Sequence, residues 1–380
     1  MNQFSFSIPQ NIILGMDCFK QLPKLLDKLA SKHTFIISGP HLNKMGVVSQ
    51  ISQLLEDKNI AVTAFTETEA NPSIETAETA TKYYKDCGAT SIIALGGGSP
   101  MDLAKAVGIL AKYGGTITDY EGAHKVPGKI VPLIAIPTTA GTGSEVTAFS
   151  VITDHSRNYK LTIFSYELLP TYALLDPSFI MSLPQSVAAA TSMDAFIHAL
   201  EAYLSLDASP FSDAMAEKAM ELMGKNIRAF VGNRQNKEAA CAMMSGSMFA
   251  GIAFSFARLG NVHAMAHPLG GFFNIAHGVA NAILLPIVLD FNSLTNTGRY
   301  EKIYYFLTGK QVSAFTPDML VKEIKALTKN LGIPENLSQL GVTADKIPAM
   351  AADAMKSGNI AVNPRATTKE DIERLYTIAL

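Results

Sequence analysis

The run Ser91-Ile92-Ile93-Ala94-Leu95-Gly96-Gly97-Gly98-Ser99-Pro100-Met101-Asp102 decides how this 380-residue chain folds. Its first five residues predict a buried strand, and a helical pattern begins at Met101. The three glycines between them let the backbone approach a ligand, and a helix N-terminus favours a phosphate. Ser99 as N-cap, Pro100 as first helical residue and Asp102 in the first turn also make an ordinary helix start. Because the spacing is not G-x-G-x-x-G, this run alone is weak evidence for a dinucleotide.

Short β-branched runs alternate with longer helical patterns on both sides of this stretch, from Thr34 to about Asp176. That rhythm predicts a parallel sheet wrapped by helices. We expect strands at 34–38, 61–65, 91–95 and 131–136, and helices at 46–58, 74–87 and 101–113.

The sequence changes character beyond Leu183-Pro184, where long stretches rich in Ala, Met and Leu carry little strand signal. Helices are expected at 186–204, 212–230 and 237–256. The prolines at 170, 177 and 184 place a boundary near residue 180. We therefore expect an α/β dinucleotide-binding domain over 1–182 and an all-helical, metal-binding domain over 183–380.

The composition excludes several classes of partner. A net charge of -2, from 31 basic and 33 acidic residues, gives no electrostatic footprint for nucleic acid or an anionic membrane. The longest wholly apolar stretch, 282–289, is too short to span a bilayer. No export signal is expected, because Met1 to Gly15 carries no basic residue ahead of its apolar run. Three widely spaced cysteines predict neither a disulfide framework nor a zinc ribbon. A cytoplasmic protein with reduced thiols is expected.

A second loop follows the strand expected at 131–136. It reads Pro137-Thr138-Thr139-Ala140-Gly141-Thr142-Gly143-Ser144-Glu145, with hydroxyl groups crowded onto a flexible turn. Ligands of open α/β sheets bind beyond the carboxyl ends of the strands, so this loop and the glycine run are expected to line one site. The alternative is an ordinary turn rich in Thr and Gly.

One carboxylate and four histidines of the helical half form a candidate metal site. Asp194 and His198 are four residues apart on an expected helix and therefore share a face. His263 and His267 repeat that spacing, and His277 follows ten residues later. One carboxylate with three imidazoles suits Fe(II) or Zn(II), and four histidines are one more than such a site needs.

Together these motifs resemble the iron-dependent (group III) alcohol dehydrogenases, of the lactaldehyde reductase and 1,3-propanediol dehydrogenase type. The resemblance covers nearly the whole chain and implies the dehydroquinate synthase-like architecture, with the active site in a cleft between the two domains. The motifs that carry it are the glycine run, Pro137-Thr138-Thr139-x-Gly141-Thr142-x-Ser144-Glu145, Met193-Asp194-Ala195-x-x-His198-Ala199-x-Glu201-Ala202-Tyr203, Gly260-x-x-His263-Ala264-Met265-Ala266-His267, His277-Gly278-x-x-Asn281-Ala282-x-Leu284-Leu285-Pro286 and Asn363-Pro364-Arg365.

The resemblance also implies roles for individual residues. The metal ligands would be Asp194, His198, His263 and His277, with His267 beside the nicotinamide and substrate. Because an imidazole titrates near neutral pH, His267 is also the candidate catalytic residue that passes the proton, and structural support of the ligand helix is the alternative role. Phe254 would line the substrate pocket. The NAD(P)-binding residues would be Gly39, Asn71, Gly97, Gly98, Ser99, Asp102, Thr138, Thr139, Thr142, Thr147, Lys160 and His267.

The chain departs from the family pattern at several positions. Gly39 follows the second strand, where relatives commonly have an Asp that accepts the ribose 2'-hydroxyl and repels a 2'-phosphate. NADP(H) is therefore expected to be accepted. Phe256 replaces a common Asn, and Phe149 stands at the substrate side where some relatives are polar. Arg258 is a candidate partner for an anionic substrate, although a structural ion pair is the favoured role.

The expected function is that of a metal-dependent NAD(P)-linked alcohol dehydrogenase that interconverts a short-chain aldehyde and its primary alcohol. The metal would act as a Lewis acid on the carbonyl oxygen. The resemblance also implies a homodimer or a higher homo-oligomer. Two alternatives are a non-redox lyase of the dehydroquinate synthase type and a nucleotide-binding sensor. The lyase would need a basic cluster for a phosphorylated acid, and the helical half shows none near its histidines.

Overall fold

The computed structural model of the chain describes residues 4–8, 11–157 and 159–380. The chain divides into two compact units. The α/β unit comprises Ser7–Thr139 and Gly143–Phe179, and the helical unit comprises Met1–Phe6, Ala140–Thr142 and Ile180–Leu380. Helix α6, Pro177–Ile180, lies where one unit gives way to the other.

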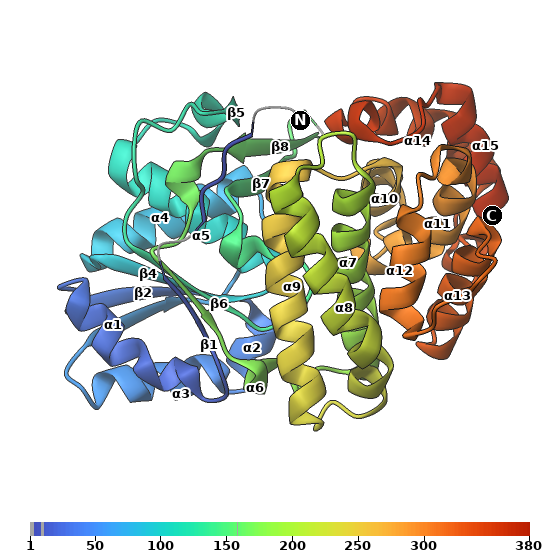
Figure 1. The fold of residues 1–380 in the computed structure, drawn as a ribbon. Helices are drawn as coiled ribbons and strands as arrows, with labels where there is room; N and C mark the ends of the chain where they lie inside the picture. The colour runs from blue at the N-terminus through green and yellow to red at the C-terminus, as the bar shows by residue number, and fades with distance from the viewer. Residues whose placement is uncertain (1–3, 9–10, 158) are drawn as a thin grey trace. The chain divides into compact units, whose positions relative to one another are not determined.

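A six-stranded parallel sheet forms the centre of the α/β unit, and β1, β2, β4 and β6 are labelled in Figure 1. The strand order is β1-β9-β6-β4-β2-β3. All six residues of β4 are buried, as expected of a strand that helices cover on both faces. The strands are β1 Asn11–Leu14, β2 His33–Ile37, β3 Ala61–Phe65, β4 Ser91–Gly96, β6 Leu133–Pro137 and β9 Tyr172–Leu175.

Alternate residues of the sheet pack into two separate cores, one on each face. Phe35 and Ile92 join one core with α4 and α5, whereas Ile36 and Ile93 join the other with α1 and α3. This period of two is the alternation that a strand imposes on its side chains. The helices of this unit are α1 Leu22–Lys28, α2 Pro40–Lys44, α3 Val47–Glu56, α4 Ile74–Cys87 and α5 Gly98–Tyr113, with short 3-10 turns at Cys18–Gln21, Ile117–Tyr120, Ser144–Val146 and Tyr166–Leu168.

A second, three-stranded sheet was not expected from the sequence. Strands β7, Phe149–Asp154, and β8, Tyr159–Phe164, pair antiparallel, and β5, Gly122–Ala123, lies parallel to β8. Strand β1, at one edge of the large sheet, and β9, which pairs with it, were also missed.

The predicted start of α5 is wrong. The helix begins at Gly98 with Gly97 as its N-cap, so Ser99 and Pro100 are its second and third residues. The chain turns earlier than predicted because Gly96 adopts a φ of 150°, which suits only glycine. Pro100 is tolerated in the first turn because the N–H that proline lacks has no partner within the helix there.

The helical unit contains nine α-helices among its described residues, and α7, α8 and α9 pack side by side (Figure 1). The α/β unit and this helical unit confirm the predicted fold class. The helices are α7 Gln185–Leu204, α8 Pro210–Gly232, α9 Lys237–Ala257, α10 Asn261–Phe273, α11 His277–Asn292, α12 Arg299–Thr308, α13 Pro317–Asn330, α14 Ile347–Ala354 and α15 Lys369–Ala379, with 3-10 turns at Ser293–Thr295, Ser338–Leu340, Ala344–Lys346 and Gly358–Val362.

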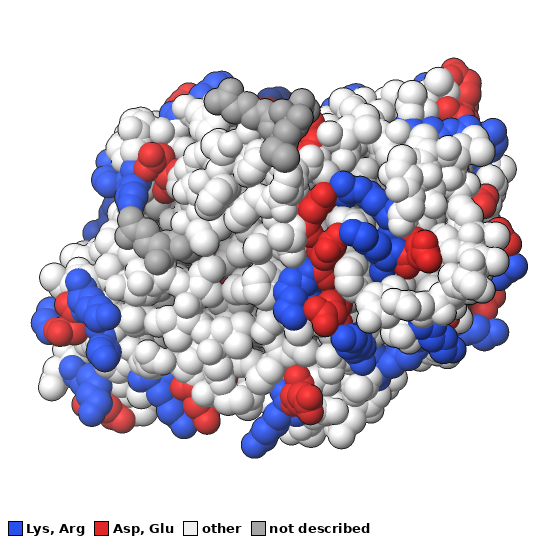
Figure 2. All heavy atoms as spheres, viewed as in Figure 1, with Lys and Arg blue, Asp and Glu red and all other residues white. Residues whose placement is uncertain are grey.

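Two segments of the helical unit, Lys237–Ala257 and His277–Thr295, are long and apolar enough to cross a membrane. They were not expected from the sequence, because the longest wholly apolar run covers only 282–289. In the most apolar stretch of each segment, 61% and 67% is buried inside the structure, so both segments pack as core helices. On the face seen in Figure 2, basic and acidic side chains of the described residues are interspersed, in keeping with the net charge of -2.

Candidate functional site

Three of the four predicted metal ligands meet in the helical unit. Asp194 lies in the middle of α7, His263 in the first turn of α10, and His277 is the first residue of α11. One ligand atom of each lies within 4.8 Å of the others, a spacing at which one ion can bind all three. Asp194 and His263 are buried, whereas the side chain of His277 is 39% exposed. The cluster is therefore closed on one side and accessible at His277.

His198 lies beside this group, one turn after Asp194. Its ring stacks on the ring of His263, with 4.6 Å between centroids and 20° between planes. Its Nδ1 donates a hydrogen bond to the carbonyl oxygen of Gly141, 3.2 Å away. That bond fixes the proton on Nδ1 and leaves Nε2 as the nitrogen that can bind a cation.

Gly278 explains how His277 comes so close to Asp194. A Cβ atom at Gly278 would overlap the carbonyl oxygen of Ala190 on α7 and lie 3.3 Å from the Cβ of Asp194. Only glycine therefore lets α11 begin against α7 at this point, which brings the preceding histidine to the carboxylate.

Glu201 orients His263, and the sequence analysis assigned it no role. Its Oε2 lies 2.5 Å from Nδ1 of His263, and its two oxygens accept from the backbone N–H groups of Val262 and His263 at 2.7 and 3.3 Å. A buried carboxylate on the far nitrogen of an imidazole is the usual support of a metal-binding histidine. Asp194, His198 and Glu201 follow one another at spacings of four and three, so their shared helix face was a usable signal.

The protonation of this cluster follows from burial and from its two carboxylates. Burial alone lowers the pKa of His263, but Asp194 and Glu201 outweigh it and raise the pKa to about 9. Burial lowers the pKa of His198 to about 3. Burial opposes the ionisation of Asp194, but the surrounding imidazoles hold its pKa well below the usual range. Without a metal, the cluster thus contains a carboxylate and a cationic His263 at neutral pH.

The side chain of Asn281 lies between three of the predicted ligands. Its Nδ2 lies 2.8 Å from Oδ1 of Asp194, and 3.1 Å from Nε2 of both His263 and His277. One amide nitrogen thus faces a carboxylate oxygen and two ring nitrogens at once, while its own buried Oδ1 has no hydrogen-bond partner among the described residues. The donor set of one carboxylate and imidazoles fits a divalent Fe or Zn ion. Asn281 follows His277 by four residues, a spacing that could have identified it.

His267 lies next to this group and outside it. It is exposed, one turn after His263 on α10, and its ring stacks on His277 with centroids 5.3 Å apart. An exposed imidazole beside an accessible ligand suits proton exchange with solvent.

The predicted substrate residues fall in both units. Phe254, on α9, stacks on His198 with centroids 4.6 Å apart and therefore borders the cluster. Arg258 pairs with Asp207 at 3.8 Å, both about half exposed, in keeping with an ion pair. Phe256 packs against Phe211 instead of entering the cluster. Phe149 begins β7 in the α/β unit and contacts Phe164.

Two loops meet at the carboxyl ends of β4 and β6 in the α/β unit. The N–H of Thr138 donates to the carbonyl oxygen of Gly96 at 3.0 Å. A Cβ atom at Gly97 would lie 3.3 Å from Oγ1 of Thr139, so glycine keeps this approach open. Gly98 begins α5, where free N–H groups favour a phosphate. Thr142, the remaining threonine of the second loop, belongs to the helical unit.

Three further residues predicted to bind the nucleotide join in one network. Nζ of Lys160 donates to Oδ1 of Asn71 at 2.7 Å, and the backbone N–H of Asn71 donates to Oγ of Ser99 at 3.3 Å. Asn71 adopts a positive φ of 57°, which asparagine tolerates better than most residues. The network places a cation and a hydroxyl beside the first turn of α5.

Lys105 is a fully buried cation that the sequence analysis missed. Its Nζ donates to the carbonyl oxygens of Ser144, Thr147 and Phe149 at 2.8, 3.0 and 2.7 Å. Asp102, one turn earlier, accepts from Oγ of Ser144 at 3.0 Å. Burial raises the pKa of Asp102 to about 6 and lowers that of Lys105 to about 8. These two side chains fasten the 144–149 segment, including the predicted cofactor residue Thr147, to α5.

Gly39 is the N-cap of α2 and lies just beyond β2, as predicted. Its φ of -95° is open to any residue, and a Cβ atom there would meet only the carbonyl oxygen of Thr68, at 3.5 Å. Nothing in the backbone therefore requires glycine at this position.

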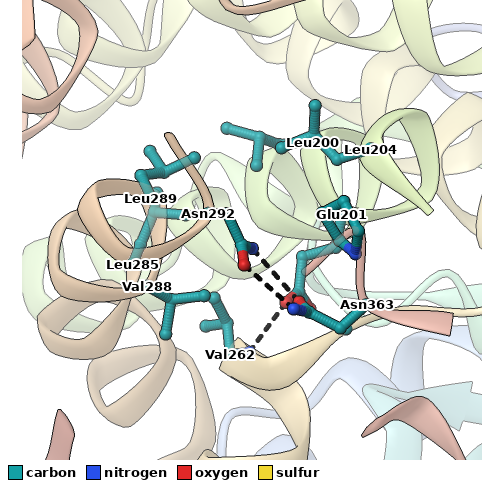
Figure 3. A pocket seen from close by; sticks show the side chains of 11 residues that line it. Leu200, Glu201, Leu204, Val262, Leu285, Val288, Leu289, Asn292 and Asn363 are labelled. Carbon is teal, nitrogen blue, oxygen red and sulfur yellow. Dashed lines mark hydrogen bonds between the residues drawn. The ribbon is translucent and has the colours of Figure 1, made fainter. Parts of the chain in front are cut away.

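A small, mainly apolar pocket in the helical unit has Glu201 on its wall (Figure 3). Its cavity volume of about 10 Å³ is about that of one water-sized sphere, and the polar side chains of Glu201, Asn292 and Asn363 on its wall are already hydrogen-bonded. It is not the substrate site. The lining residues are Leu200, Glu201, Leu204, Gly260, Val262, Leu285, Val288, Leu289, Asn292, Asn363 and Pro364.

Comparisons with known proteins match the chain, over nearly its whole length, to one family of enzymes. Residues 9–177 match the family model described as iron-containing alcohol dehydrogenase, and residues 188–380 match the C-terminal model of the Fe-containing alcohol dehydrogenase family. The chain is 33% identical to NAD-dependent methanol dehydrogenase of Bacillus methanolicus over 99% of this chain and 100% of that protein. It is 35% identical to 1,3-propanediol dehydrogenase of Klebsiella pneumoniae over 98% of each. The crystal structure of a 1,3-propanediol oxidoreductase, 34% identical, superposes over all of both chains with a TM-score of 0.97.

Proposed function

The chain belongs to the iron-containing alcohol dehydrogenase family, and on this basis we propose that it interconverts a short-chain aldehyde and its primary alcohol, with NAD(P)(H) as hydride carrier. In this proposal the α/β unit binds the dinucleotide and the helical unit binds the metal. The observation that carries it is the cluster of Asp194, His263 and His277, whose ligand atoms all lie within 4.8 Å of one another.

Asp194, His198, His263 and His277 would hold one Fe(II) or Zn(II) ion. When bound, that ion supplies a Lewis acid that polarises the carbonyl oxygen and stabilises negative charge developing on it. Two of the ligand rings are already oriented by hydrogen bonds in the structure. Glu201 holds the ring of His263, and the Gly141 carbonyl holds the ring of His198, so that Nε2 of each remains available.

His267 would move the proton that alcohol and aldehyde exchange. Its ring is exposed and stacks on His277, the accessible member of the cluster. An imidazole titrates near neutral pH, so it can take a proton from solvent and pass it on.

The α/β unit would bind the nucleotide at the carboxyl ends of its strands. Gly97, Gly98 and Ser99 would hold the pyrophosphate at the first turn of α5, and Asn71 with Lys160 would hold a ribose. Thr138, Thr139, Thr142 and Thr147 would face the nicotinamide half. The nicotinamide, when bound, supplies the hydride. Because Gly39 carries no carboxylate against a 2'-phosphate, we propose that NADPH is accepted as well as NADH.

The substrate we propose is a small, neutral aldehyde or primary alcohol. Phe254 stacks on His198 and so places an aromatic ring beside the proposed metal site. Arg258, the candidate for an anionic substrate, is already paired with Asp207. Family resemblance supports a cytoplasmic enzyme that forms a homodimer or larger homo-oligomer, which light scattering after size exclusion tests.

The function is tested by oxidation of NADH and NADPH, measured anaerobically against a panel of neutral and anionic short aldehydes. Metal-free protein is compared with protein given Fe(II) or Zn(II). We expect turnover only after metal is restored, with neutral aldehydes preferred. Absence of turnover across the panel, in protein that binds both metal and nucleotide, would contradict the proposal.

A further inference from the structure

Asn363, in the Asn363-Pro364-Arg365 motif, has no role in the function proposed above. It is 2% exposed and lies at the start of α10, the helix that carries His263. Its Oδ1 accepts a hydrogen bond, 3.2 Å long, from the backbone N–H of Asn261, the first residue of that helix. A buried amide far along the chain thus reaches the helix that bears a candidate metal ligand.

The start of α10 has no cap of its own. Its N-cap is Gly260, which has no side chain to accept from the first N–H groups. Asn363 takes the N–H of Asn261, and Glu201 takes those of Val262 and His263. A Cβ atom at Gly260 would lie 2.9 Å from Oε1 of Glu201 and 3.0 Å from Oδ1 of Asn363. Glycine therefore leaves room for both distant side chains to cap the helix together.

Asn363 is itself held on several sides. It exchanges two hydrogen bonds with Asn292, the last residue of α11, at 2.9 and 3.1 Å (Figure 3). Its Nδ2 also donates to the carbonyl oxygen of Arg365 at 2.8 Å, and Asn261 donates to Oγ1 of Thr367 at 2.9 Å. The amide pair thus joins the start of α10 to the end of α11, whose first residue is His277.

We propose that Asn363 is a positioning residue of the metal site. By fixing the first turn of α10 to α11, it sets where the backbone of His263 stands, while Glu201 sets the direction of its ring. The inference rests on the proposed function, because it takes His263 as a metal ligand. It assigns the C-terminal motif to the metal site, about 100 residues away from His263 in the chain.

The test is the affinity of metal-free, full-length protein for Zn(II), measured by competition with a chromophoric chelator. We expect Asn363→Ala to weaken Zn(II) binding about tenfold or more, the range seen when outer supports of metal ligands are removed. Asn363→Asp keeps the oxygen that accepts from Asn261 and Asn292, but it loses the two donations from Nδ2 to Asn292 and to the carbonyl oxygen of Arg365. Its Zn(II) affinity should therefore fall less than that of Asn363→Ala, and an equal or larger loss would show that the bond to Asn261 does not position the site.

Asn236→Ala is the matched control. Asn236 caps α9 in the same unit by accepting from the N–H of Ala239, and no hydrogen bond described here joins its side chain to α10. Its loss removes a helix cap of the same chemistry and should leave Zn(II) affinity unchanged. NADH affinity, which belongs to the α/β unit in our proposal, should be unchanged in all these variants.

Wild-type Zn(II) affinity in Asn363→Ala would overturn the inference, as would an equal loss in Asn236→Ala. If Asn363→Ala does not fold, Asn292→Ala replaces it. That change removes only the partner of the amide pair, and wild-type affinity in it would equally overturn the inference. His277→Ala is measured in parallel. Retained Zn(II) binding there would contradict the proposed metal site itself, whereas loss there with no effect at Asn363 would contradict this inference alone.

Discussion

Oε2 of Glu201 and Nδ1 of His263 lie 2.5 Å apart in the interior of the helical unit, and both side chains are almost wholly buried. The same carboxylate also accepts from the first backbone N–H groups of α10. One side chain therefore fixes both the helix and the ring of a candidate metal ligand. Glu201 also helps to raise the pKa of His263.

Glu201→Gln should weaken Zn(II) binding by about 10- to 100-fold, because an amide cannot serve as the anionic acceptor that orients His263. The affinity is measured by chelator competition on metal-free protein. Glu238→Gln, which changes an exposed glutamate in the first turn of α9, is the control and should have no effect. Equal affinity in Glu201→Gln and wild type would show that the carboxylate does not support the ligand.

Metal binding should release a proton. In the metal-free protein Asp194 and Glu201 raise the pKa of His263 to about 9, so the ring is cationic at pH 7 and must lose a proton to bind metal. Affinity for Zn(II) should therefore fall as the pH falls below about 9, by about tenfold per pH unit for one proton. Calorimetry at pH 7 in buffers of different ionisation enthalpy should detect about one proton per ion. Heats that do not depend on the buffer would rule out a cationic His263.

His267→Gln should lower turnover by about 100-fold or more, the usual contribution of a positioned acid or base. The metal content should stay at the wild-type level, because His267 lies outside the group of Asp194, His263 and His277. His277→Ala should instead lose the metal. Metal analysis beside steady-state kinetics distinguishes the two, and a His267→Gln protein without metal would assign His267 to the metal site.

Gly39→Asp should shift the ratio of kcat/KM for NADH over NADPH by about tenfold or more toward NADH, because like charges about 4 Å apart near a surface repel by a few kcal/mol. The backbone accepts the change, since φ at Gly39 is -95° and a Cβ atom there meets only one oxygen at 3.5 Å. Gly39→Ala adds the Cβ without the charge and should leave the ratio unchanged. The same ratio in the Asp variant and the wild type would refute this account of cofactor choice.

Local patterns were enough to predict the centre of the α/β unit and the long helices of the helical unit. The expected helix at 74–87 and strand at 61–65 match α4 and β3 residue for residue, because amphipathic spacing and β-branched runs act within a few residues. The start of α5 was misplaced because Ser99-Pro100 reads as a helix start, whereas the turn is made earlier by Gly96. Strand β9 has only four residues, too few to show a period.

The candidate metal site could be predicted for a similar reason, because Asp194 with His198 and His263 with His267 lie one helical turn apart. The residues that hold its candidate ligands in place could not be predicted. Asn363 meets Asn261 across 102 residues, and no local pattern encodes such a pair. Lys105 looks like any lysine on a helix until its burial against the 144–149 segment is known. The residues that support a metal site are determined by tertiary contacts. The residues that bind the metal can often be identified from short spacings in the sequence.

The most direct test of the proposed function follows the hydride itself. Protein reconstituted with Fe(II) or Zn(II) is given a short neutral aldehyde and NADPH or NADH carrying deuterium at C4, in both stereochemical forms, and the alcohol is examined by mass spectrometry. The account predicts one deuterium on the carbinol carbon from one of the two forms, and none when metal is withheld. Alcohol formed without deuterium from either form, or label transfer that is equal in metal-free protein, would contradict metal-dependent hydride transfer.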